Sequence, residues 1–350
     1  MDRQNVLNAS LQFARKAGLF SAARKLTAKV LRVLCYHGFS LDDEHRFLPS
    51  MFVSPDTLSS RMRLLCERGY RVIPLDEGVE RLKSGTLDPD SVVITTDDGF
   101  FNCLSVGAPI FREFDLPSTL YITTYYVKHQ TPIYNFLLLN MFLRSNRESV
   151  NLAHLAPEVP AEIRVKGSPG TNPEWRAVAK AIDEHYEIGE RDEIFDEIGR
   201  ILDVDYKHLR DSRMYHLLAP HEVTQLEALG VDIQLHTHRH RLPEDESGIA
   251  YEIGRNRDIL SQLCSSSLDH FCYPSGQWRS AHLPILESLG IKSATTCDIG
   301  INRYDVDPLR LYRFLDRDDI SELRFEAEIS GYMPLLRANV NRFRRAAGNG

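Results

Sequence analysis

The organisation of this chain follows from the sequence Ser91-Val92-Val93-Ile94-Thr95-Thr96-Asp97-Asp98-Gly99. Residues 92–96 are β-branched and show no polar alternation, which predicts a parallel strand buried on both faces. A buried strand cannot hold two unpaired charges, so Asp97 and Asp98 are expected where the strand emerges, and Gly99 permits a sharp turn there. Catalytic groups of α/β folds usually lie at this rim, although Asp-Asp-Gly is by itself also an ordinary turn sequence.

Strand and helix patterns alternate along much of the remaining chain. Residues 32–36 and 118–124 have strand patterns, and a helix pattern at 103–114 separates the second of these from the strand at 92–96. This alternation predicts an α/β fold with a parallel sheet or barrel. A chain of 350 residues can form one barrel-sized domain, which we place at residues 31–330, before a basic C-terminal tail at 331–350.

Residues 127–229 differ from this pattern and predict a helical insertion. Helices are expected at 175–188, 191–202 and 220–229, with a Pro/Gly-rich break at 166–173. An insertion that follows a barrel strand lies over the active face, so it is a candidate lid or substrate-binding subdomain. The alternative is a structural decoration without a role in binding.

Residues 1–30 predict an N-terminal basic amphipathic helix, with an interruption near Gly18. Apolar residues such as Leu11 and Phe20 recur among basic ones such as Lys16. Two interpretations stay open, because they share one periodicity: a helix packed on the domain with a solvated basic face, or a peripheral contact with an anionic membrane.

The composition excludes several classes of function. With 42 basic and 49 acidic residues, the protein lacks the positive charge expected of a nucleic-acid binder. The six cysteines stand singly, without zinc or thioredoxin spacing, which indicates buried free thiols in a reducing compartment. We find no signal peptide, no segment apolar enough to span a bilayer, and no pattern that indicates an oligomeric state. A cytoplasmic protein is expected, with contact at the inner face of the membrane as an open alternative.

A second group of polar residues follows the strand pattern at 231–235, in His236-Thr237-His238-Arg239-His240. His236 and His240 are four residues apart, so on a helical turn they would share one face, whereas His238 would point elsewhere. With Asp98 as a third ligand they would leave an open position for water, as in a catalytic zinc site. This ligand set favours a divalent ion, with zinc as the first choice.

A metal-activated water also needs a group that accepts its proton, and Asp97 is next to the metal ligand Asp98. Hydrolysis at an acyl carbon further requires stabilisation of an oxyanion, for which a backbone N–H is suitable. Ser275, in the turn after the strand pattern at 270–273, is a candidate for that donor.

These motifs resemble those of a known family. Thr95-Thr96-Asp97-Asp98-Gly99, His236-Thr237-His238-Arg239-His240 and Phe271-Cys272-Tyr273-Pro274-Ser275-Gly276 are similar to the first three motifs of the polysaccharide deacetylases, carbohydrate esterase family 4, with its NodB-homology domain. The resemblance implies a distorted (β/α)7 barrel that removes acetyl groups from N-acetylated sugars with a divalent metal. By position it makes Asp97 the base, Asp98, His236 and His240 the metal ligands, and the Ser275 amide the oxyanion donor.

The sequence also departs from the family pattern. Thr96 replaces a usual Phe, and Cys272 and Tyr273 replace the Arg-Pro of the commoner third motif, as in the Tyr-Pro-x-Gly branch. Arg313 is our candidate for the missing arginine that orients the base. The late Leu-x-His motif, whose histidine serves as the general acid, has no match, since His282 is the only histidine after His270.

We therefore expect a metal-dependent deacetylase acting on a glycan, glycolipid or biosynthetic intermediate. Two alternatives remain. A metal pair His236-x-His238 would indicate an amidohydrolase or phosphoesterase of another class, and a chain that kept only the fold would be a non-catalytic carbohydrate-binding module.

Overall fold

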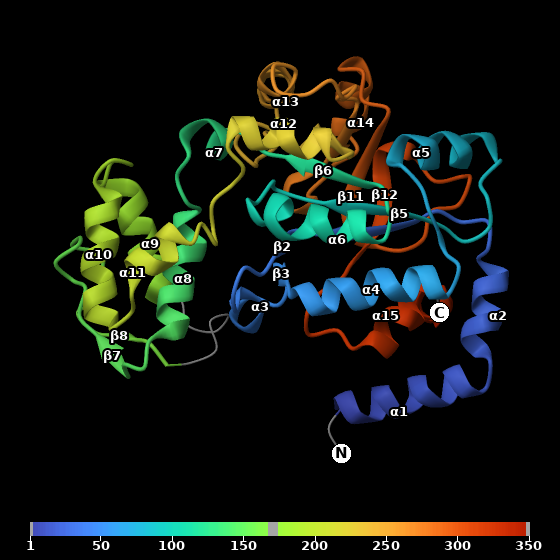
Figure 1. Cartoon of the computed structure of the whole chain (residues 1–350), viewed down its shortest axis with the longest axis horizontal. Helices are drawn as coiled ribbons and strands as arrows, with labels where there is room; N and C mark the ends of the chain where they lie inside the picture. Colours follow the sequence, from blue (N-terminus) through green and yellow to red (C-terminus); the bar gives the residue numbers. More distant parts are fainter. Residues whose placement is uncertain (1–2, 167–173, 348–350) are drawn as a thin grey trace.

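The computed structural model describes residues 3–166 and 174–347, and its centre is a closed parallel barrel (Figure 1). The order β1-β12-β11-β10-β9-β6-β5 closes because β5 pairs back to β1. The strands are β1 (Arg32–Tyr36), β5 (Ser91–Thr96), β6 (Ser118–Ile122), β9 (Val231–Leu235), β10 (His270–Cys272), β11 (Ser293–Ile299) and β12 (Leu311–Leu315). This confirms the seven-stranded barrel.

The register of β5 places the two aspartates at the carboxyl rim. Every residue of β5 is buried, as its lack of polar alternation predicted, and Thr96 lies beside Tyr36 of β1. His37 and Asp97 therefore leave the barrel at the same level. The short β4 (Arg71–Val72) pairs only with the start of β5, where it is an additional edge strand outside the barrel.

Helices surround the barrel and bury the outer faces of its strands. They are α4 (Pro55–Glu67), α5 (Leu75–Ser84), α6 (Ala108–Glu113) after the π-helical turn Cys103–Gly107, α12 (Pro220–Ala228), α13 (Glu246–Leu260), α14 (His282–Ser288) and α15 (Glu322–Ile329). Ser54 is the N-cap of α4, since its side chain accepts a hydrogen bond from the Thr57 N–H. The small elements β2 (Gly38–Phe39), α3 (Glu44–Phe47) and β3 (Phe52–Val53) follow β1.

The segment between β6 and β9 forms a separate lobe beside the barrel (Figure 1, left). It contains α7 (Thr124–His129), α8 (Tyr134–Arg144), β7 (Ser149–Val150), β8 (Ile163–Arg164), α9 (Glu174–His185), α10 (Arg191–Leu202) and α11 (Tyr206–Asp211). Its extent differs from the expected 127–229, because α12 packs on the barrel strand β9. The expected break at 166–173 lies outside the described residues except for Lys166.

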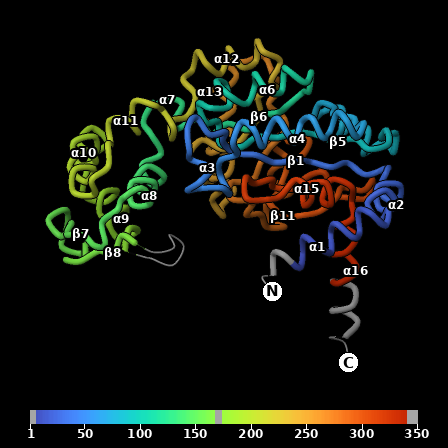
Figure 2. Tube along the Cα trace, turned by 60° about the horizontal axis from the view of Figure 1, so that its bottom comes forward, coloured from blue at the N-terminus to red at the C-terminus, as the bar shows by residue number. Residues whose placement is uncertain are grey.

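The N-terminal segment is helical, and the expected interruption near Gly18 divides it into two helices. α1 (Arg3–Lys16) and α2 (Leu19–Leu26) are separated at Gly18, which has a φ of 75°. The expected C-terminal tail is the helix α16 (Tyr332–Ala347), and residues 348–350 lie outside the description. Figure 2 shows α1, α2 and α16 together at one end of the molecule. Within the described residues, every helix is too short or too polar to cross a membrane.

Candidate active site

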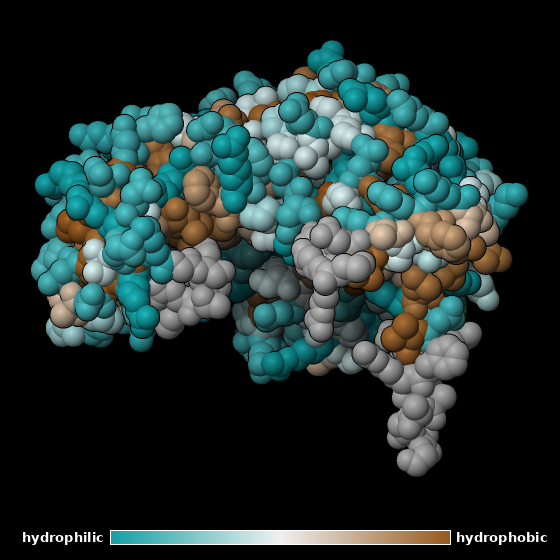
Figure 3. Space-filling model, turned by 90° about the horizontal axis from the view of Figure 1, so that it is seen from below, coloured by the Kyte–Doolittle hydropathy of each residue, from teal (hydrophilic) through white to brown (hydrophobic). Residues whose placement is uncertain are grey.

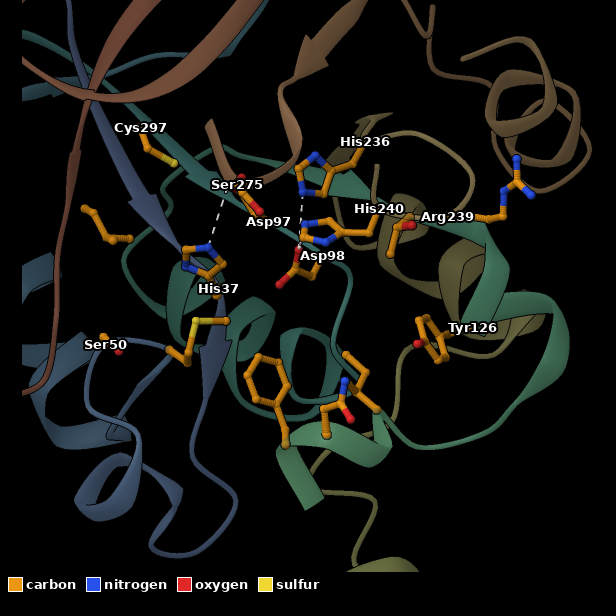
Figure 4. A pocket seen from close by; sticks show the side chains of 16 residues that line it. His37, Ser50, Asp97, Asp98, Tyr126, His236, Arg239, His240, Ser275 and Cys297 are labelled. Atoms are coloured by element: carbon orange, nitrogen blue, oxygen red, sulfur yellow. Dashed lines mark ion pairs between the residues drawn. The ribbon is translucent and has the colours of Figure 1, made fainter. Parts of the chain in front are cut away.

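Three side chains that are distant in the sequence converge at the carboxyl rim. The Nε2 atoms of His236 and His240 each lie 3.2 Å from Asp98 Oδ1 (Figure 4). Within the described residues this oxygen is buried and has no partner in hydrogen-bond geometry. Two ligand atoms about 2.0 Å from one tetrahedral ion would be about 3.3 Å apart, so this donor set fits a zinc-sized ion.

The tautomer of His236 is fixed by its second nitrogen. His236 Nδ1 lies 2.8 Å from the Cys272 carbonyl oxygen, so Nδ1 carries the proton that is donated to it. The Nε2 lone pair is then free for a metal, and such a partner is typical of metal-binding histidines. Burial alone would lower the pKa of His236, but the Asp98 and Asp97 carboxylates raise it above its ordinary value.

The loop after β9 corrects one expectation. Residues 236–240 do not form a helical turn; Thr237 and His240 adopt left-handed backbone conformations, with φ values of 65° and 52°. Two sharp reversals instead bring both imidazoles to Asp98. Asp98 is itself left-handed, with a φ of 71°, and non-glycine residues in this conformation are typical of functional sites.

His238 lies outside the cluster, as its position in the motif predicted. Its Nδ1 is 3.0 Å from Thr124 Oγ1, and its ring packs against Tyr125. The alternative metal pair His236-x-His238 is therefore wrong for this structure.

Asp97 forms a buried ion pair with Arg313 of β12. Arg313 Nη1 and Nη2 donate to the two carboxylate oxygens at 2.7 Å each, and only 1% and 2% of the two side chains are exposed. Burial alone would raise the pKa of Asp97, but Arg313 lowers it to about 2. Asp97 is therefore ionised and can only accept a proton at neutral pH.

A cavity of about 640 Å³ opens over these groups (Figure 4). Its polar wall contains the two aspartates, the two clustered histidines and His37, whose Nε2 is 4.0 Å from Asp97 Oδ2. His37 Nδ1 is buried, without a hydrogen-bond partner among the described residues. The position of His37 beside Asp97 depends on the closed barrel, because the pairing of β1 with β5 brings the two strand exits together.

The remaining walls come from the lobe and from the third motif. Tyr126, Ile133 and Phe136 contribute from the lobe, which supports the expectation that it borders the active face. Ser275 lines the cavity from the turn after β10, with a φ of 54°. His282 borders a different cavity beside Trp278.

A comparison of the chain with models of known protein families agrees with the sequence motifs. The family model described as polysaccharide deacetylase matches residues 84–294. This chain belongs to the polysaccharide deacetylase family. It is thus a hydrolase of N-acetyl amide bonds in carbohydrates.

Three solved structures are similar to this deacetylase. They are the Streptococcus pyogenes deacetylase PplD in complex with acetate (16% identity, TM-score 0.57, covering 87% of this chain and 99% of that one), IcaB from Ammonifex degensii (15%, 0.54, 86% and 97%) and a de-N-acetylase from Aggregatibacter actinomycetemcomitans (14%, 0.53, 85% and 98%). At these identities the likeness shows the fold. No curated protein matches the chain in sequence.

The altered third motif of this deacetylase is explained by Arg313. The Cys272 thiol lies 3.2 Å from Arg313 Nη2 and 3.4 Å from Asp97 Oδ2, so the small side chain leaves the volume that the guanidinium occupies. Cys35 also contacts Asp97, at 3.6 Å. The expectation that all cysteines are buried is wrong for Cys66 and Cys297, which are exposed, and for Cys264, which is only partly buried.

Proposed function

We propose that this deacetylase uses a divalent ion, with zinc as the first choice, held by Asp98, His236 and His240. Its substrate is an N-acetylated sugar in a glycan, a glycolipid or a biosynthetic intermediate. The observation that carries this proposal is the convergence of three donor atoms on one point beside a buried, ionised Asp97. We extend it to a cytoplasmic location, as expected from the scattered cysteines.

Each residue around the cavity has a proposed role in the hydrolysis. A bound divalent ion would polarise the amide carbonyl and acidify the attacking water. Asp97 accepts the proton of that water, and the bidentate contact with Arg313 holds the carboxylate in place. The Ser275 N–H stabilises negative charge on the carbonyl oxygen.

We assign the general acid to His37. Breaking the C–N bond requires a proton on the leaving amine, and His37 lines the same cavity as the metal ligands, with its Nε2 4.0 Å from Asp97 Oδ2. The products are acetate and the free amino sugar, so the atoms of one water are divided between them. This assignment fills the role for which the sequence offered no residue.

Variants of the two aspartates test the division of roles. Asp98→Ala should lose bound metal, measured by elemental analysis, whereas Asp97→Asn should keep the metal and lose turnover by about 10²–10⁴-fold. His238→Ala is the matched control, because it changes a histidine of the same loop outside the cluster, and it should keep the metal. Equal loss of metal in both aspartate variants, or full acetate release after exhaustive chelation, would contradict the proposal.

Acetate release from a panel of N-acetylhexosamine glycans, glycolipids and nucleotide-linked sugars would identify the substrate. The expected result is preference for one member of this panel. If the metal-bound protein released acetate from none of these compounds, the proposed substrate class would be wrong.

A further inference from the structure

The helices at the two chain ends expose large apolar side chains. On α1, Val6 and Phe13 are seven residues apart on one face and are 46% and 72% exposed. On α2, Leu19 and Leu26 repeat the same spacing at 43% and 75%. Leu336 and Val340 of α16 add 41% and 49%. We call these six residues the terminal surface, and Figure 3 shows hydrophobic residues gathered beside the chain ends.

Packing on the barrel does not account for the terminal surface. Other side chains of the N-terminal helices are already buried: Leu11, Ala14 and Phe20 form a cluster with Ala327 of α15, and Ala23 is also buried. Phe20 also stacks on Tyr332 of α16, with ring centroids 5.2 Å apart. Each N-terminal helix therefore has further apolar side chains that its packing on the domain leaves partly or largely exposed.

The charge around the terminal surface is positive. The sequence from Arg3 to Leu41 contains no Asp or Glu, although the whole protein is acidic. Three arginines of these helices are held by carboxylates of the barrel, at Arg15–Glu326 (3.2 Å), Arg24–Asp90 (3.0 Å) and Arg337–Glu328 (2.6 Å). Lys16 and Lys25 are exposed beside the apolar stripes.

We infer that the terminal surface docks the deacetylase on the interface of an anionic lipid bilayer. Exposed Phe and Leu side chains flanked by lysines are the pattern of helices that lie in the headgroup region, where apolar burial and attraction to anionic lipid act together. The ion pairs with Asp90, Glu326 and Glu328 fix the helices to the barrel, so the whole domain is held at the membrane.

Other occupants fit these residues less well. A symmetric dimer through this surface would bring lysines of both copies together, and like charges oppose such contacts. A nucleic-acid-binding surface consists mainly of basic and polar groups. The terminal surface is instead apolar at its most exposed points, Phe13 and Leu26.

Flotation of the full-length protein with vesicles tests this inference without depending on activity. Vesicles of phosphatidylcholine with one-third phosphatidylglycerol should bind the protein, pure phosphatidylcholine should bind it much more weakly, and added salt should release it. Phe13→Ser/Leu26→Ser should weaken binding about tenfold or more for each apolar anchor removed. Loss of one lysine should weaken vesicle binding about fivefold, so the double variant Lys16→Glu/Lys25→Glu should weaken vesicle binding about 25-fold or more.

Matched controls change exposed residues on other parts of the molecule. Tyr251→Ser on α13, where 53% of the residue is exposed, and Lys207→Glu on α11 should leave vesicle binding unchanged. The inference is overturned if anionic and neutral vesicles bind equally, or if neither double variant weakens binding. The inference is also overturned if the wild type does not bind vesicles and the same variants abolish a different interaction. That interaction would be self-association, measured by sedimentation, or binding to duplex RNA.

Discussion

Replacing Arg313 by Met should destabilise the protein and slow its chemistry together. Both side chains of the pair with Asp97 are almost fully buried, and two N–O contacts of 2.7 Å join them. Removing one partner of a buried ion pair leaves the other charge desolvated, which costs about 3–5 kcal/mol. Arg313→Met should lower the free energy of unfolding of the metal-free protein by about that amount, measured by urea denaturation.

The same substitution releases the base from its fixed position. A misplacement of about 1 Å can reduce turnover by about 10²-fold, so kcat for acetate release should fall by that order while KM changes little. Arg313→Lys keeps one charged donor and should recover part of both losses. Arg313→Met/Asp97→Asn removes both charges and should be more stable than Arg313→Met alone.

Arg61→Met is the matched control. Arg61 Nε lies 3.0 Å from Asp316 Oδ2 in a second buried pair, with 3% and 0% of the side chains exposed. This variant should lose comparable stability but keep its kcat once folded. The reasoning would be refuted if Arg313→Met changed stability by less than about 1 kcal/mol, or if both arginine variants reduced kcat equally.

Three further predictions concern the cavity and the lobe. His37→Gln should reduce amide deacetylation far more than hydrolysis of an activated aryl acetate, because that leaving group needs no proton; equal losses would reject His37 as the acid. Phe136→Ala should raise KM about tenfold without changing bound metal, since Phe136 is an apolar wall of the cavity; an unchanged KM would mean that the substrate does not reach it. Burial and then Arg213 lower the pKa of His216 to about 4. In unfolded chains histidine titrates near 6.5, so the unfolded state binds more protons between about pH 6.5 and 4, and stability falls there by up to about 3 kcal/mol as the pH drops. His216→Asn should remove that part of the pH dependence in urea titrations, whereas the exposed His208→Asn should keep it.

The strand pattern of residues 92–96 was sufficient to predict a buried parallel strand and the exit of Asp97 and Asp98. Local sequence determines these features because a β-branched apolar run allows few alternatives and charges must leave a buried strand. The motifs around His236 and Ser275 likewise identified the family and the candidate ligands, since they are short and contiguous.

Other features depended on packing between distant segments. The predicted helical turn at 236–240 was wrong, because the loop reaches Asp98 through left-handed residues that periodicity does not encode. The lobe proved shorter than the helical pattern, because α12 covers β9.

Local motifs fixed the residue types at the site, and barrel closure decided which of them meet. The pairing of β5 with β1 places His37 opposite Asp97, and β12 brings Arg313 to the same carboxylate across 216 positions of sequence. The sequence could offer Arg313 only as a candidate, since a guanidinium that orients a base is recognised by its position in space. Only the closed sheet determines that position, because its register sets which side chains share the interior of the barrel.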